Sequence, residues 1–217
     1  MKSILLGSGR PGAGIITIAI NLAIGLVRRG YRVLLASAQT NRTLTTWLKG
    51  TEERPAGLLT EYPSLKWYDQ PFNFTELKTH NGKFYDYLLF IGGAEIELIK
   101  QWQEKPPQVL WIVEVGNDYI EETVAIDREL RQGYGKTTGI DLVVPNKAHP
   151  GEWKKTSEWV FDLGDRLGWE KVADPIPYCE AIHDLPQEHK SVWELPDYYN
   201  NRKEAFQHLV EKVIQLK

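Results

Sequence analysis

Short, almost continuous runs of apolar residues alternate along the chain with longer segments in which apolar residues recur at helical spacing. The apolar runs are rich in Val, Ile and Leu, which is typical of strands buried on both faces of a parallel sheet. Strands are expected at residues 3–6, 31–36, 84–91, 109–115, 140–144 and, as a short piece, 171–173. Helices are expected at residues 15–29, 43–48, 95–103, 119–131, 151–167 and 201–216. This alternation predicts the α/β class, with a doubly wound, mainly parallel sheet that carries helices on both faces.

The length of the chain, 217 residues, is sufficient for one domain with a substantial core and short for two independent domains. No internal repeat or low-complexity linker divides the sequence, so a single domain is expected over residues 1–217. A glycine-rich loop at residues 7–14 follows the first strand, and an amphipathic helix at about 201–216 ends the chain. The polar face of that helix has no basic excess, so we expect it to pack onto the domain and not onto a membrane.

One apolar run, residues 13–27, has to be distinguished from a membrane segment. It is shorter than the about 20 residues that a helix needs to span a bilayer, and Thr17 and Asn21 interrupt it. A signal peptide would carry its positive charge before the run, whereas Arg28-Arg29 follows it. The run therefore predicts a core helix. The single cysteine, Cys179, excludes an internal disulfide and a zinc site built from several cysteines, and a cytoplasmic protein is expected.

The balance of charges restricts the classes of partner. The chain has 26 Lys plus Arg and 29 Asp plus Glu, for a formal net charge of −3. Because the surface as a whole is not basic, nucleic acid would have to bind at a local basic patch. The pairs Lys154-Lys155 and Arg202-Lys203 are candidates for non-specific DNA contacts, although such pairs are usually solvated surface.

The glycine-rich loop is the strongest candidate for chemistry. Such a loop binds phosphates in open α/β sheets, because its backbone N–H groups and the positive end of the helix dipole face the ligand. Gly7, Gly9 and Gly12 match the dinucleotide fingerprint, which is a weak signal by itself. That fingerprint also needs an acidic residue at the end of the second strand to hold the ribose. Ser37 stands there with Arg42 nearby, so NADP is a candidate ligand and NAD is disfavoured.

A P-loop is the second interpretation of the same segment. The residues in register with a phosphate-binding loop and the start of its helix are Gly9, Arg10, Pro11, Gly12, Ala13, Gly14, Ile15, Ile16 and Thr17. A working P-loop needs a Lys that reaches the β- and γ-phosphates and, directly after it, a hydroxyl that binds Mg²⁺. Ile15 and Ile16 stand at these two positions.

Several segments in the expected order resemble the ParA/MinD-type partitioning ATPases, a family of P-loop NTPases. The resemblance is carried by Gly9-Arg-Pro-Gly-Ala-Gly-Ile-Ile-Thr-Ile-Ala-Ile-Asn-Leu-Ala23, Arg29-Gly-Tyr-Arg-Val-Leu-Leu35, Leu44-Thr-Thr-Trp-Leu48, Tyr85-Asp-Tyr-Leu-Leu-Phe-Ile91, Val144-Pro-Asn146 and Lys190-Ser-Val-Trp-Glu194. It spans nearly the whole chain. It implies a P-loop NTPase-like fold, ATP hydrolysis with Mg²⁺, protein partners, and a homodimer that pairs face to face across two ATP molecules.

The chain departs from this family at the positions that carry charge or bind metal. The resemblance implies a signature Lys where Arg10 stands, a second Lys at Ile15 and the magnesium-binding Thr at Ile16. It also implies an Asp at Ser37 and the Walker B Asp at Ile91, and a second acidic position falls in Gln39-Thr-Asn41. Apart from Arg10, which keeps its positive charge, each change removes a charge or a metal ligand while the apolar scaffold is kept.

These losses decide the mechanism that we expect. Phosphoryl transfer depends on Mg²⁺ and on cations that stabilise developing charge, and losing one such group costs roughly 10²–10³ in rate. We therefore predict no efficient ATP hydrolysis and no catalytic residue. ATP or ADP binding could persist through the backbone N–H groups, with Arg10 as the cation, whereas Mg²⁺ has no evident ligands. Asn146 follows a strand where the family often places an Asn on the purine base, so it is the candidate for base binding.

Gly135-Lys-Thr-Thr138 looks like the missing P-loop but is rejected. It lacks the earlier glycine, because Leu130 stands there, and it precedes a strand, whereas a P-loop follows one. A polar surface turn is expected instead.

The leading functional hypothesis is a ParA/MinD-like protein of a chromosome or plasmid partitioning or positioning system. It would be a non-hydrolysing or nucleotide-sensing relative that acts through protein partners, with a homodimer as a further option. The first alternative is an active ATPase with a divergent P-loop that uses Arg10. The second is an NADP-binding reductase built on Gly7, Gly9 and Gly12.

Overall fold

The computed structural model describes residues 1–39, 41–52, 57–68, 84–93, 99, 106–116, 119–133 and 136–216. Within them, six parallel strands form one sheet in the order β3-β2-β4-β1-β5-β6. The strands are β1 (Lys2–Gly7), β2 (Val33–Ser37), β3 (Leu65–Tyr68), β4 (Tyr87–Gly93), β5 (Gln108–Glu114) and β6 (Leu142–Asn146). Their side chains alternate between two buried layers, since Ile4 and Leu6 belong to one core cluster and Leu5 to the other.

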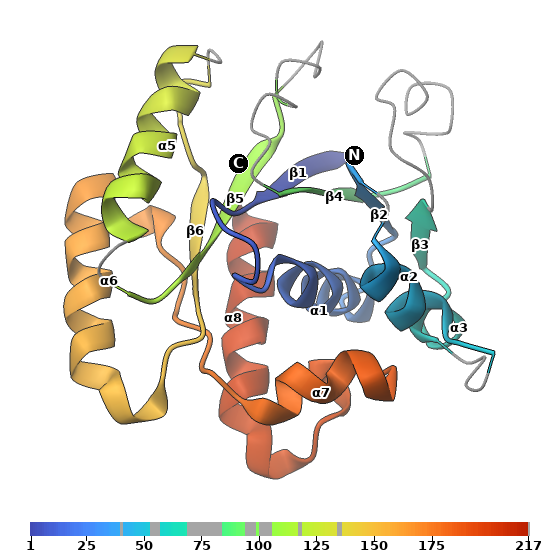
Figure 1. Ribbon diagram of the computed structural model, residues 1–217. Coiled ribbons are helices and arrows are strands. Elements are labelled where there is room, and N and C mark those ends of the chain that lie inside the picture. Colours follow the sequence, from blue (N-terminus) through green and yellow to red (C-terminus); the bar gives the residue numbers. More distant parts are fainter. Residues whose placement is uncertain are drawn as a thin grey trace.

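Helices cover both faces of the sheet, as the alternating pattern predicted (Figure 1). One face packs against α1 (Ile15–Arg28), α2 (Arg42–Lys49), α3 (Leu58–Glu61), α7 (Glu180–Glu188) and α8 (Asn200–Gln215). The other face packs against α5 (Ile120–Gly133) and α6 (Trp153–Leu167). Single 3-10 turns lie at η3 (Pro150–Glu152), η4 (Trp169–Lys171), η5 (Val192–Glu194) and η6 (Asp197–Tyr199). The predicted α/β class with a doubly wound parallel sheet is confirmed.

Three elements were not predicted, and one prediction was wrong. The sequence pattern missed α3, the edge strand β3, in which only Leu65 is buried, and α7, which contains Pro186. The strand expected at 171–173 is absent, because the 3-10 turn η4 leads into a single bridge between Val143 and Val172. The helix expected at 95–103 lies outside the described residues apart from Ile99.

The C-terminal helix α8 packs on the domain, as its amphipathic pattern predicted. Its apolar side chains, including Phe206 and Val210, are buried in the same core cluster as α1. At the other end of the chain, Lys2 donates from Nζ to the carbonyl oxygens of Val213 and Ile214, at 3.2 Å each. A cation at a helix C-terminus is favoured by the helix dipole. In the described part of the chain, no helix is both long and apolar enough to cross a bilayer.

A buried asparagine ties α1 to the segment before α8. Asn21 is fully buried, and its Oδ1 accepts from the backbone N–H of Val192 at 2.7 Å while its Nδ2 donates to Thr17 O at 2.9 Å. The indole N–H of Trp193 donates to the carbonyl oxygen of Asn21 at 3.0 Å. The bond between Asn21 and Val192 is buried, so each of its two polar groups needs its partner.

Asn21→Ala is expected to lower the free energy of unfolding by about 1–3 kcal/mol, because it leaves the buried Val192 N–H without an acceptor. Urea denaturation measures the change. The control is Gln207→Ala, which removes an exposed hydrogen bond to Glu211 and should cost less than about 0.5 kcal/mol. Equal losses in the two variants would contradict the role assigned to Asn21.

Candidate functional site

The glycine-rich loop lies where the strand order of the sheet reverses. The central strand β1 pairs with β4 on one side and with β5 on the other, and the loop leads from its carboxyl end into α1. Ligands of open α/β sheets bind in the crevice at such a point. The structure therefore places the predicted loop, residues 7–14, at the position in this fold where a phosphate site is expected.

The loop turns sharply because two glycines adopt conformations that other residues avoid. Gly12 has φ +84° and Gly14 has φ +94°, and Gly14 is also the residue that caps α1. The first turn of α1 has no side-chain cap and no acidic residue. Gly7, at the end of β1, lies against the indole of the buried Trp111. These contacts determine the shape of the loop without a ligand.

The two positions that a P-loop needs for Lys and Thr carry apolar side chains that pack inward. Ile15 and Ile16 are partly buried against the same core cluster as α1. Thr17, the next residue, accepts from Asn21 Nδ2 through its backbone carbonyl. Neither isoleucine can donate to a phosphate oxygen or bind a metal ion.

The two strand ends beside the loop also lack carboxylates. Ser37 and Ile91 are partners in the pairing of β2 and β4, and both are buried. These are the positions at which the family resemblance implies Asp, and the structure places them side by side in the sheet. Among the described residues, no group of three or more His, Cys, Asp or Glu side chains could hold a metal ion.

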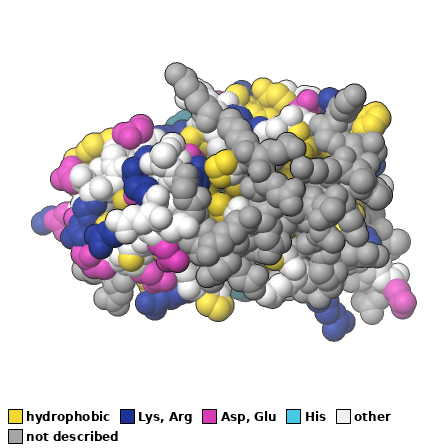
Figure 2. Space-filling model, turned by 90° about the horizontal axis from the view of Figure 1, so that it is seen from above, with side chains coloured by type: hydrophobic (Ala, Val, Ile, Leu, Met, Phe, Trp, Pro, Cys, Tyr) yellow, Lys and Arg dark blue, Asp and Glu magenta, His cyan; other side chains and the backbone are white. Residues whose placement is uncertain are grey.

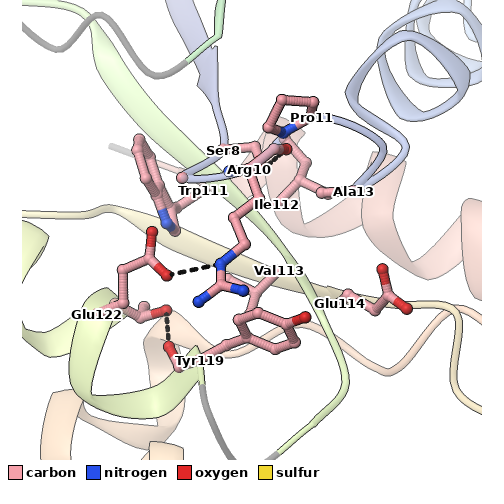
Figure 3. A pocket seen from close by; sticks show the side chains of 12 residues that line it. Ser8, Arg10, Pro11, Ala13, Trp111, Ile112, Val113, Glu114, Tyr119 and Glu122 are labelled. Carbon is pink, nitrogen blue, oxygen red and sulfur yellow. Dashed lines mark hydrogen bonds and ion pairs between the residues drawn. The ribbon is translucent and has the colours of Figure 1, made fainter.

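The cation of the loop, Arg10, faces the protein itself. Its Nε donates to Glu122 Oε2 at 3.3 Å, and its guanidinium lies 4.5 Å from the ring centroid of Tyr119 (Figure 3). The Glu122 carboxylate also lies against the loop, because a Cβ atom on Gly9 would be 2.0 Å from its Oε1. Sequence reasoning missed Glu122 and Tyr119, and no local motif marks them, since only the fold brings α5 to the loop.

The pocket beside the loop is small and carries more negative than positive charge. It holds Arg10 together with the carboxylates of Glu114 and Glu122, and its volume is about 70 Å³. Ligand pockets usually have volumes of about 300–1,000 Å³. Glu114 also accepts from Lys147 Nζ at 3.0 Å. Among the described residues, this pocket is therefore smaller than a usual ligand pocket.

Asn146, the candidate for base binding, lies under the loop. Its side chain is buried, and its Nδ2 donates to Ala13 O at 2.8 Å. A Cβ atom on Gly14 would lie 2.3 Å from the same nitrogen. The amide thus supports the loop, and its role toward a base stays a prediction.

The segment that imitated a P-loop was expected to be a polar surface turn, and for its lysine this is wrong. Lys136 is only 6% exposed, and its Nζ lies 2.7 Å from Asp141 Oδ2. Nζ also donates to Thr138 Oγ1 at 2.9 Å. Close by, burial lowers the pKa of Lys171, and the negative charge of Asp127 raises it and so offsets part of this effect. Lys136 therefore anchors the connection from α5 to β6, because a buried charge needs its partner.

The basic pairs considered for DNA are mostly balanced by carboxylates. Lys154 lies 4.0 Å from Glu158, and Lys155 lies 2.8 Å from Glu152. Among the described residues on the face seen in Figure 2, Lys and Arg side chains are intermingled with Asp and Glu. Non-specific DNA binding stays a prediction with little support from charge.

No protein-family model and no curated protein matches the sequence. Solved structures match the fold over nearly the whole chain. MinD of Aquifex aeolicus, solved as a MinC:MinD complex, has a TM-score of 0.76 and 19% identity, covering 100% of this chain and 97% of that chain. A Cyanothece McdA variant in complex with ATP has a TM-score of 0.72 and 18% identity, covering 100% of this chain and 97% of that chain. A ParA family ATPase from Chlorobium tepidum TLS has a TM-score of 0.71 and 16% identity, covering 97% of this chain and 98% of that chain.

At these identities the likeness establishes the fold. The chain has the P-loop NTPase-like fold of the MinD, McdA and ParA ATPases, which confirms the fold implied by the resemblance.

Two loop glycines provide a matched test of the packing. Gly7→Ala should lower the free energy of unfolding by about 1–3 kcal/mol, because the new Cβ would lie 2.5 Å from the buried Trp111 ring. Gly9→Ala should cost less than about 1 kcal/mol, since the Glu122 carboxylate can swing into solvent and only an exposed ion pair is lost. Thermal and urea denaturation measure both. A larger loss in Gly9→Ala would refute the packing described for the loop.

Lys136→Met should cost about 3–5 kcal/mol of stability, because it leaves the Asp141 carboxylate buried without a cation. Adding Asp141→Asn should recover part of this loss. Lys155→Met, which breaks the exposed pair with Glu152, should cost less than about 1 kcal/mol. If the two lysine variants unfold at the same urea concentration, the lysine at 136 is not an anchor.

Proposed function

We propose that this chain, which has the fold of the MinD and ParA ATPases, is a non-hydrolysing relative in a cellular partitioning or positioning system. It would act in the cytoplasm through protein partners. The observation that carries the proposal is the state of the glycine loop. Gly12 and Gly14 of the loop have positive φ angles, and Arg10 is paired with a carboxylate of the same chain. Ile15 and Ile16, at the positions for the catalytic Lys and Thr, are partly buried against the core.

The chemistry of phosphoryl transfer supports the loss of hydrolysis. The transition state needs cations and Mg²⁺ around the transferred group, and the protein supplies little covalent chemistry. Removing a single electrostatic group commonly costs about 2.7–4 kcal/mol of transition-state stabilisation. Here Ile15 and Ile16 replace two such groups, and the buried Ser37 and Ile91 replace two more. With all four groups replaced, we expect the transition state to lack the electrostatic stabilisation that hydrolysis needs.

The electrostatics of the loop support weak nucleotide binding. A phosphate that approaches Arg10 meets Glu122, whose carboxylate lies against Gly9, and Glu114 lines the same pocket. Carboxylates this close to Arg10 repel the negatively charged phosphate. The Arg10–Glu122 pair is exposed to solvent, so its own strength is modest, and removing the carboxylate should free the cation.

The fold and the changes in the glycine loop support a role that depends on protein partners. The MinD protein of Aquifex aeolicus has been solved with MinC, and the McdA variant of Cyanothece has been solved with ATP. We infer from this likeness in fold that the present chain also acts together with a protein partner. A homodimer of this chain would have to form without two shared ATP molecules to stabilise it.

A calorimetric titration of the full chain with ATP, ADP, GTP and NADPH, each with and without Mg²⁺, tests the proposal. We expect no ATP binding that strengthens with Mg²⁺, and no turnover of ATP. Glu122→Gln should bind ATP about two- to fivefold more tightly than the wild type at low salt, because it frees Arg10. The double variant Arg10→Gln/Glu122→Gln should lose that gain.

The matched control is Glu121→Gln, which removes the same charge from the neighbouring position, where the carboxylate pairs with Arg166. It should leave ATP binding unchanged. ATP binding by the wild type that strengthens with Mg²⁺, or turnover above background, would favour the active-ATPase alternative and overturn the proposal. Binding of NADPH alone would favour the reductase alternative.

A further inference from the structure

Two aromatic side chains form an exposed pair on α6 and the turn that follows it. Phe161 is 60% exposed and Trp169 is 47% exposed. Their ring centroids lie 4.9 Å apart, and their planes are inclined by 73°, an edge-to-face contact. Phe161 belongs to α6 and Trp169 to η4, so the pair lies on the side of the sheet that α5 and α6 cover (Figure 1).

The local backbone is built to hold Trp169 in place. A Cβ atom on Gly164, in the interior of α6, would lie 2.8 Å from the indole of Trp169, so this ring lies directly against the helix backbone. Gly168 has φ +103°, and its N–H donates to Gly164 O at 2.9 Å, which turns the chain back over the helix. A glycine inside a helix is unfavourable, and here it makes room for an indole that stays half in solvent.

Three acidic residues lie near this aromatic pair along the chain. Glu158 and Asp165 lie on the same side of α6 as Phe161, because they are three and four residues away. Glu170 follows Trp169 directly. In the described part of the chain, Asp165 and Glu170 have no cation within 4 Å, and Glu158 has only Lys154 at 4.0 Å. Lys171, which is next in sequence, points away toward Asp127 at 3.5 Å.

We propose that Phe161, Trp169 and the carboxylates of Glu158, Asp165 and Glu170 form a docking surface for a basic amphipathic segment of a partner protein. Aromatic faces attract Arg and Lys cations, and the surrounding carboxylates attract the same groups. The apolar part of the segment covers the exposed rings.

The negative charge of this surface disfavours three other binding partners: a second copy of the chain, nucleic acid and an anionic membrane. A second copy of the chain, docked through the same face, would bring two sets of carboxylates together. Nucleic acid and an anionic membrane are repelled for the same reason. The inference depends on the proposed function only in assigning this surface to the partner, and it stands whether or not the glycine loop binds a nucleotide.

The test uses the full chain and a fluorescent 15-residue peptide of Arg, Lys and Leu, with Glu replacing Arg and Lys in a control peptide. Fluorescence anisotropy should show saturable binding of the basic peptide that weakens with salt, and no binding of the acidic one. Phe161→Ser should weaken binding about five- to tenfold, and Asp165→Lys with Glu170→Lys should weaken it further.

The matched control is Trp153→Ser, which removes an exposed aromatic ring of the same helix that has Lys154 and Lys155 beside it. It should change the affinity less than twofold. Absence of saturable binding by the wild type, or equal affinities of the wild type and the double variant Asp165→Lys/Glu170→Lys, would overturn the proposal. The nucleotide titration is a separate measurement, so either proposal can fail without the other.

Discussion

The turn from the central strand β1 into the buried helix α1 is the constraint on which the rest of the structure depends. Both elements are buried, and the chain must reverse between them within a few residues. Gly12 and Gly14 provide the backbone conformations, and Gly7 provides the space beneath Trp111. This requirement is one of packing. It explains why the glycines of a phosphate-binding loop persist in a chain whose loop carries neither the lysine nor the threonine of a working site.

The groups that surround the loop satisfy one another. Asn146 donates to Ala13 O, and Arg10 pairs with Glu122 over the ring of Tyr119. In a P-loop the ligand supplies the charge that such groups meet. Here Glu122 of the same chain supplies that charge to Arg10. Ile15, where the family resemblance implies a Lys, packs against the core beside the loop.

The sequence predicted those elements whose buried apolar residues recur regularly along the chain. Strands buried on both faces and the long helices could be predicted, because their apolar patterns are continuous. β3 and α7 could not, since β3 buries only Leu65 fully and α7 contains Pro186. The substitutions in the loop could be identified by aligning its residues with those of a phosphate-binding loop. The contact between Arg10 and Glu122 could not, because residues 112 positions apart meet only in the folded chain. Burial of Lys136 was not predicted either, because its local sequence is polar and resembles a surface turn.

The first turn of α5 joins the two regions to which we assign roles. Glu122 pairs with Arg10 of the loop, and its neighbour Glu121 pairs with Arg166 of α6. Acidic residues are favoured at this end of a helix, because they face the positive end of its dipole. Two adjacent carboxylates thus hold two arginines from different layers of the molecule. Arg166 also pairs with Asp162 of α6, so it contacts carboxylates on two helices. The first turn of α5 therefore ties both the glycine loop and α6 to one short segment of the chain.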